Sequence, residues 1–292
     1  SAVDDAPTLA HLAHPNVTGW GGDGQNGTPY TFTVAEDTSN GEITFTIGDE
    51  EGGSPAISCA SKPTWVSIDD ANDKITFAPG NGDVGTNITF NCKVNDGNSD
   101  SNILYFSATV TNVNDAPTFS HNAHANVTGW GGDGMAVGTP FTFTIAEDST
   151  NGEVTFTIGD IDGDDPAISC ASKPDWVTID DANDKITFAP DNGDVGAGIA
   201  FNCKVNDGVA DSSVIYFSAT VTNVNDAPTF THNSHPNVSG WGGDGQSGTP
   251  YTFTVAEDTT NGEIVFNIAD DDGDTPTIGC ASKPTWVAID DA

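Results

Sequence analysis

Two short acidic stretches have the composition and spacing of cation sites. They read D-I-D-G-D-D at Asp160–Asp165 and D-D-D-G-D at Asp270–Asp274. Alternate carboxylates then fall on one side of a tight glycine turn, and carboxylate and amide oxygens are the ligands that calcium and magnesium take. The stretches predict a hard-cation site, with a solvated acidic turn as the alternative. A helix-loop-helix calcium loop is excluded, because no helical pattern or correctly spaced Glu follows.

All six histidines of the chain form H-x-x-H pairs: His11 with His14, His121 with His124, and His232 with His235. Two imidazole nitrogens could bind a transition metal. In an extended segment, however, residues three apart point to opposite faces, and Pro15 and Pro236 favour extension. The pattern therefore favours a surface loop over a paired metal site.

The same segments carry a tryptophan in G-W-G-G-D-G, at Trp20, Trp130 and Trp241. An aromatic face beside a polar loop suits sugar stacking, but packing of the ring against its own or a neighbouring domain is the favoured interpretation. The segments also contain N-x-S/T sequons at Asn16, Asn126 and Asn237. Such sequons arise by chance in a chain rich in Asn and Thr, so glycosylation stays open.

Composition excludes several functional classes. Lys and Arg total 7 against 43 Asp and Glu, the formal charge is −36, and the sequence has no arginine. Nucleic acids and anionic lipid surfaces need a basic footprint, so neither is an expected partner. No apolar run reaches the roughly 18 residues of a membrane span, and no charged-then-apolar leader opens the chain. No Ser/His/Asp or Glu/Glu constellation rises above chance, so we expect no enzyme.

The chain is a tandem array. V-T-N-V-N-D-A-P-T-F occurs at Val110–Phe119 and again at Val221–Phe230, and a shortened V-D-D-A-P-T occurs at Val3–Thr8. A period near 110 residues is long enough for each copy to bury its own core. We expect domains at 1–114, 115–225 and 226–292. The third copy stops about 40 residues short of the others, and we expect further polypeptide or a neighbouring chain to complete it.

Five cysteines fit the same repeat. Cys59 and Cys92 lie in the first copy, Cys170 and Cys203 lie in the second, and Cys280 has no partner in the third. Without any C-x-x-C or Cys/His zinc spacing, one pair per domain favours an intradomain disulfide and an extracellular location over two buried thiols.

Apolar residues alternate with period two in seven segments of a complete copy, and Gly, Asn, Asp or Pro fill the gaps. In the first copy the segments are Tyr30–Val34, Ile43–Ile47, Ile57–Cys59, Trp65–Ile68, Ile75–Phe77, Ile88–Val94 and Leu104–Val110. This pattern predicts an all-β chain of tandem seven-stranded antiparallel β-sandwiches. We expect Trp65, Trp176 and Trp286 to fill the cores.

These residues together resemble the cadherin-like tandem domains, nearest the dystroglycan-type and immunoglobulin-like repeats of microbial surface proteins. The resemblance rests on the V-N-D-A-P-T-F linker, the A-E-D after the first alternating strand, the aspartate cluster after the second, and V-N-D-G before the last strand. In that family calcium ions lie between successive domains. The resemblance therefore implies calcium as the cofactor.

Carried onto this sequence, the resemblance implies two sets of metal ligands. The first is Glu36, Asp83, Asn112, Asn114, Asp115, Asp160, Asp162 and Asp207; the second is Glu147, Asp194, Asn223, Asn225, Asp226, Asp270 and Asp272. The linker here reads N-V-N-D-A, so Asn112 replaces an aspartate and Ala116 an asparagine. Fewer ions per junction than in cadherins are expected.

The sequence thus predicts an extracellular structural or adhesive protein. We expect a calcium-rigidified stalk or fibre subunit, held by self-association or by continuation of the same chain. A glycan-binding module array is the alternative function.

Overall fold

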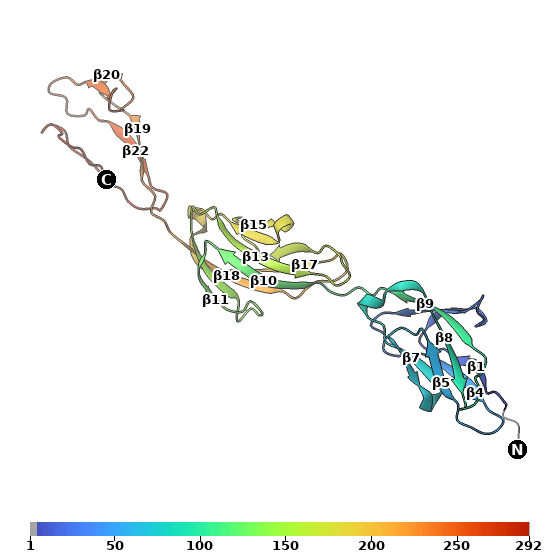
Figure 1. Cartoon of the computed structure of the whole chain (residues 1–292). Helices are drawn as coiled ribbons and strands as arrows, with labels where there is room; N and C mark the ends of the chain where they lie inside the picture. The colour runs from blue at the N-terminus through green and yellow to red at the C-terminus, as the bar shows by residue number, and fades with distance from the viewer. Residues whose placement is uncertain (1–4, 292) are drawn as a thin grey trace. The chain divides into compact units, whose positions relative to one another are not determined.

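The computed structural model describes residues 5–291, and strands make up almost all of its regular structure (Figure 1). Residues 1–4, which include the start of the shortened linker copy, lie outside the described part. The chain divides into two compact units: Ser1–Thr118 with Ile158–Ala167 and Val205–Ser212, and Phe119–Thr157 with Ile168–Lys204 and Ser213–Ala292. No helix among the described residues is long and apolar enough to cross a membrane.

The first repeat is a sandwich of two sheets. One sheet has the order β1 (Thr8–Ala13), β4 (Gly41–Gly48), β7 (Lys74–Phe77), β6 (Val66–Asp69). The other has the order β2 (Thr18–Gly21), β3 (Tyr30–Ala35), β9 (Leu104–Thr111), β8 (Gly85–Asn95), β5 (Ala56–Ala60). Alternate residues of these strands are buried, as period-two patterning requires. The predicted all-β tandem sandwich is confirmed.

One strand pair departs from the antiparallel expectation. β3 and β9 run parallel, with Tyr30 opposite Phe106 and Ala35 opposite Thr111. Parallel neighbours end at the same edge of a sheet, so the residue after β3 lies beside the residue after β9. The backbone N–H of Glu36 accordingly donates to the carbonyl of Thr111 at 3.0 Å. This pairing places Glu36 at the start of the linker.

The second repeat has the same two sheets. The first is β10 (Thr118–Ala125), β13 (Gly152–Gly159), β16 (Lys185–Phe188), β15 (Val177–Asp180). The second is β11 (Thr128–Gly131), β12 (Phe141–Ala146), β18 (Ile215–Thr222), β17 (Gly196–Asn206), β14 (Ala167–Ala171). β12 and β18 repeat the parallel pairing, with Ile145 opposite Val221.

The histidine and tryptophan segment is not the surface loop that the sequence favours. It contributes two edge strands per repeat, β1 and β2 in the first and β10 and β11 in the second. β1 pairs with β4, and Leu9 is buried in the core at 3% exposure. Glycines, prolines and histidines interrupt the apolar alternation of this segment, so its sequence did not indicate strands. Its pairing partner, β4, is distant in the sequence.

Aromatic rings join the two sheets in the core. Phe77 of β7 lies against Phe32 of β3, with centroids 5.0 Å apart, and against Trp65 at 5.8 Å. Trp65 and Trp176 are each 6% exposed, so the expected core role is confirmed for both. Trp286 is 67% exposed, and its expected core role is wrong in this structure. The described third repeat has no strand equivalent to β7, which carries Phe77.

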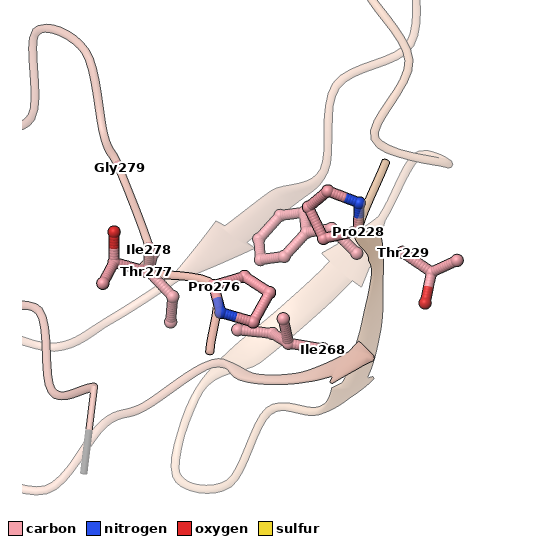
Figure 2. Close-up of a pocket in the computed structure, with 8 residues that line it drawn as sticks. Pro228, Thr229, Ile268, Pro276, Thr277, Ile278 and Gly279 are labelled. Carbon is pink, nitrogen blue, oxygen red and sulfur yellow. The ribbon is translucent and has the colours of Figure 1, made fainter. Parts of the chain in front are cut away.

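The third repeat has only two pairs of strands in the described part of the chain. They are β19 (Thr229–Ser234) with β22 (Val265–Ala269), and β20 (Ser239–Gly242) with β21 (Thr252–Thr254). Figure 2 shows an apolar hollow of this repeat in which Pro228, Ile268 and Pro276 face one another. Phe230 occupies the position equivalent to the buried Phe119 of the second repeat, and it is 56% exposed.

Each complete repeat has one disulfide. Cys59 pairs in register with Cys92 across β5 and β8, and the two form a disulfide; Cys170 and Cys203 form the equivalent bond, each closing 33 residues. Cys280 is free and exposed. The predicted disulfides are confirmed. Of the four bonded cysteines, Cys92 and Cys203 are buried in the core.

Removing the Cys59–Cys92 disulfide should measurably lower the free energy of unfolding of the first repeat. In the chain-entropy account, a loop of this length contributes about 3 to 4 kcal/mol. We expect the Cys59→Ala, Cys92→Ala double variant to lose about that much free energy of unfolding of the first repeat in urea. Cys280→Ala is the matched control and should change nothing. Titration of the unreduced, denatured protein should find one thiol per chain; five thiols would contradict the assignment.

Candidate metal centres

The first centre begins with Glu36, which is 1% exposed although it is charged. Its Oε1 accepts a hydrogen bond from the backbone N–H of Val113 at 2.7 Å. Its Oε2 is buried and has no hydrogen-bond partner. The parallel β3–β9 pair therefore fixes one carboxylate oxygen on the linker and leaves the other free for a different ligand.

The linker itself connects three loops of the same unit. Asp115 donates its backbone N–H to Oδ2 of Asp162 at 2.6 Å, and its carboxylate accepts from Nδ2 of Asn81 at 2.9 Å. Asn114 donates to Oδ2 of Asp207 at 3.0 Å. The linker N–H groups and amides thus hold the loops in one cluster.

Four buried oxygens of this cluster have no partner among the described residues. They are Oε2 of Glu36, Oδ1 of Asn81, Oδ2 of Asp160 and Oδ1 of Asp162. Buried polar atoms are normally hydrogen-bonded, because leaving one unpaired costs the desolvation of that group. Three of these residues are carboxylates, so a bound cation is a chemically suitable partner for them.

Charge supports the same conclusion. The ion pairs of Lys74, Lys93 and Lys185 are made with Glu42, Asp100, Glu153 and Asp180, away from the cluster. At the cluster, Asp160, Asp162 and Asp164 each bring a carboxylate oxygen within 4.8 Å of the others. Like charges this close repel one another, and a divalent cation among them would reverse that energy.

Asp207 is held as a carboxylate by its own loop. The backbone N–H groups of Ala210 and Val209 and the amide of Asn114 all donate to it, and together they hold the pKa of Asp207 below its usual value, with the Ala210 bond as the largest cause.

The second centre repeats the first. Glu147 is 1% exposed and accepts from the N–H of Val224 at 2.7 Å. Asn192 donates to Asp226 at 2.8 Å, and the N–H of Asp226 donates to Oδ2 of Asp272 at 2.6 Å. Oxygens of Glu147, Asn192 and Asp272 are buried without partners. Asp270, Asp272 and Asp274 bring their carboxylates within 4.8 Å of each other.

The structure brings most of the sequence-predicted residues together. Those joined to a linker by hydrogen bonds, directly or through Asp162 or Asp272, are Glu36, Asn114, Asp115, Asp160, Asp162, Asp207, Glu147, Asp226, Asp270 and Asp272. Asn225 donates to the carbonyl of Asp226, and no hydrogen bond joins its side chain to an acidic loop among the described residues. Asn112 and Asn223 are exposed.

Asp83 and Asp194 have a different contact from the one the resemblance implies. Each lies in a 3₁₀ turn, Asn81–Asp83 or Asn192–Asp194, and its Oδ2 accepts from the N–H of Gly80 or Asp191 at 3.0 Å. The residues of these turns that reach the linker are Asn81 and Asn192, which the sequence reasoning missed. A signal existed: each asparagine precedes its linker aspartate by 34 residues.

The first repeat has a weaker acidic stretch, which reads G-D-E-E-G-G at Gly48–Gly53. Asp49 accepts from the N–H of Glu51 at 2.9 Å in a turn of its own. The groups of three carboxylates found among the described residues belong to the second and third repeats only.

The H-x-x-H pairs form a second kind of cluster, which the sequence reasoning did not favour. Nδ1 of His14 lies 3.1 Å from Nε2 of His11, and both rings stack on Trp20, at centroid distances of 4.2 and 4.3 Å. The expectation that these histidines point to opposite faces is wrong. The register of β1 against β4 shifts between His11 and Ala13, and this bulge turns His14 to the face of His11.

This stacking also bears on the alternatives for the same segment. The imidazole of His14 lies flat on the indole of Trp20, with 5° between the planes, on a face that sugar stacking would use. The sequon residues Asn16, Asn126 and Asn237 use their Nδ2 atoms to donate to the carbonyls of Asn40, Asn151 and Asn261. Nδ2 is also the atom that a glycan would modify.

Comparison with known proteins gives likeness of fold. No protein-family model and no curated protein matches the chain. Among solved structures, the chain is similar to human mucin-like protocadherin EC1-2, at 14% identity over 66% of this chain and 96% of that one, with a TM-score of 0.39. Protocadherin gamma B2 cadherin domains 3-6 are 12% identical over 84% of this chain and 55% of that one, with a TM-score of 0.41. The insect immune protein hemolin is 13% identical over 66% of this chain and 44% of that one, with a TM-score of 0.33.

The chain spans less than two thirds of the protocadherin gamma B2 and hemolin structures. Tandem cadherin domains, and the tandem immunoglobulin domains of Sidekick-1, are among the solved structures to which this chain is similar, as the sequence predicts.

The histidine clusters should make stability depend on pH. Burial first, and then the charge of the neighbouring histidine, lower the pKa of His11 and His121 from the usual 6.5. A lowered folded-state pKa adds stability that is complete above about pH 6.5 and is lost as the pH falls through the folded value. We expect the midpoint of thermal unfolding to fall between pH 7 and pH 5. The His11→Gln, His121→Gln variant should lose most of this dependence; an equal dependence in both proteins would contradict the assignment.

Proposed function

We propose that the chain is a tandem-domain structural or adhesive protein whose linkers are fixed by calcium. The observation that carries the proposal is the set of buried, unpartnered oxygens around each linker, on Glu36, Asn81, Asp160 and Asp162 and on Glu147, Asn192 and Asp272. Calcium takes six to eight oxygens, so waters, Asp115 or backbone carbonyls would complete the coordination.

Calcium suits these centres better than magnesium. Magnesium demands a small, nearly ideal octahedron and keeps several waters, whereas calcium accepts irregular sets of carboxylate and amide oxygens. The oxygens here come from a strand end, a 3₁₀ turn, the linker and an acidic loop, and amide groups contribute beside carboxylates. Such a varied set favours the larger ion.

Calcium would act on the linker through its flanking loops. Without the ion, the carboxylates of Asp115, Asp160 and Asp162 repel one another, and linkers between domains with small polar interfaces are expected to swing. With the ion, bending the linker would require breaking coordination bonds. The role of calcium is therefore mechanical, and the domains are 1–114, 115–225 and 226–292.

The disulfides and the charge support an extracellular setting for this role. Disulfide bonds persist in oxidising compartments, and millimolar extracellular calcium matches sites of modest affinity. The repetition of one domain along the chain suits a stalk or fibre. Self-association or continuation of the same chain is the partner that we propose.

Calcium should stabilise the protein and protect its linkers. With a dissociation constant of about 10⁻⁴ to 10⁻³ M, typical of extracellular modules, calcium at ten times that value adds roughly 1.4 kcal/mol per site. We expect a higher unfolding midpoint, slower proteolysis at Asn112–Ala116 and a narrower size distribution in solution scattering. Identical behaviour in calcium and in chelator would remove calcium from the function.

Single substitutions can distinguish the residues that bind calcium from those that only close a turn. Asp162→Asn and Asn81→Ala should each weaken calcium binding at the first centre about tenfold, or about 1.4 kcal/mol, and leave the second centre intact. Asp83→Asn is the control, because its amide oxygen can still accept from Gly80 and close the turn. Weaker binding by Asp83→Asn, with none lost in Asn81→Ala, would restore the ligand set that the resemblance implies.

A further inference from the structure

The H-x-x-H pairs have the same geometry in all three repeats. The Nδ1 to Nε2 distances are 3.1 Å for His14 and His11, 3.3 Å for His124 and His121, and 3.2 Å for His235 and His232. His14, His124 and His235 stack on their tryptophans within 4° to 9° of parallel. The third repeat keeps this geometry although its described residues form only the β19–β22 and β20–β21 pairs, so the geometry does not require the complete sandwich.

A bulge in the edge strand produces the pairing of the rings. In β1, His11 lies opposite Phe45 and Ala13 opposite Thr44, so Leu12 is an extra residue. In β19, His232 lies opposite Phe266 and Ser234 opposite Val265, which makes Asn233 the extra residue. An extra residue reverses the alternation of the side chains that follow it, and this brings the second histidine to the side of the first.

The nitrogen separation fits one metal ion. With metal–nitrogen bonds of about 2.05 Å, separations of 3.1 to 3.3 Å correspond to nitrogen–metal–nitrogen angles of about 100°. This value lies between the octahedral and the tetrahedral angle. Small rotations of the two imidazoles would direct both lone pairs at the ion. No proton has to leave the pair, because the ring that donates the present hydrogen bond can carry its proton on its other nitrogen.

The surroundings hold the rings in place. Trp20 supports both imidazoles, because both rings stack on its indole. His11 and His14 are half-buried, so one side of the pair stays open to solvent.

We propose that each H-x-x-H pair and its tryptophan form a site for one divalent transition metal of the copper and zinc class. The ligands are Nε2 of the first histidine and Nδ1 of the second, and water occupies the remaining positions. Imidazole nitrogens suit these metals, and copper should bind more tightly than zinc. The oxygen-only centres at the linkers suit calcium instead, so one chain would bind two classes of ion at separate places.

The test is a metal titration of the full chain with calcium in large excess, so that the linker centres are occupied. Copper sulfate is added in one series and zinc chloride in another, and bound metal is counted after equilibrium dialysis. We expect three copper ions per chain, one for each pair. Copper bound by imidazoles that stack on the indole should also quench the fluorescence of Trp20, Trp130 and Trp241.

Variants that keep the stacked ring but remove its nitrogen make the test specific. His14→Phe should bind two copper ions, and the His14→Phe, His124→Phe, His235→Phe triple variant should bind none and lose the quenching. Far-ultraviolet circular dichroism checks that the triple variant keeps its strands, and the single variant stands if the triple does not fold. Three ions still bound by the triple variant, no copper bound by the unsubstituted chain, or bound copper without quenching would each overturn the proposal.

Discussion

The parallel pairing of β3 with β9 is the constraint on which the candidate calcium centres depend. Because both strands end at the same edge of the sheet, the residue after β3 meets the linker that follows β9. Glu36 can then accept the N–H of Val113 while almost completely buried. An antiparallel neighbour would have placed that carboxylate at the opposite end of the domain. The same pairing of β12 with β18 places Glu147 on the next linker.

The other acidic residues are held near this buried carboxylate by the N–H and amide donors of the linker. The second oxygen of Glu36 has no protein partner, and the oxygens of Asp160 and Asp162 that lack partners belong to the loop bonded to Asp115. The ion pairs of Lys74, Lys93 and Lys185 are made with carboxylates outside this cluster, and the printed partners of its other oxygens are amides and backbone N–H groups. Such an arrangement is stable as a cation site and costly without one.

The histidine clusters show how one inserted residue changes the chemistry of a strand. Without the bulge at Leu12, His11 and His14 would lie on opposite faces, as ordinary alternation requires. With the bulge, two imidazoles and an indole form one stack at the edge of the sandwich. The linker centres and the histidine clusters use different elements and different ligand atoms, so either can be altered without the other.

The sequence by itself determined the repeat, the all-β sandwich, the disulfide pairs and most of the acidic residues around the linkers, because alternation, spacing and composition are local properties. The tertiary structure alone decided the rest. It determined the parallel pairing of β3 with β9, the choice of Asn81 beside Asp115 where the resemblance offered Asp83, and the facing of His14 toward His11. Each depends on which distant strand is a neighbour and in what register, and a one-residue shift in register reverses the side-chain faces.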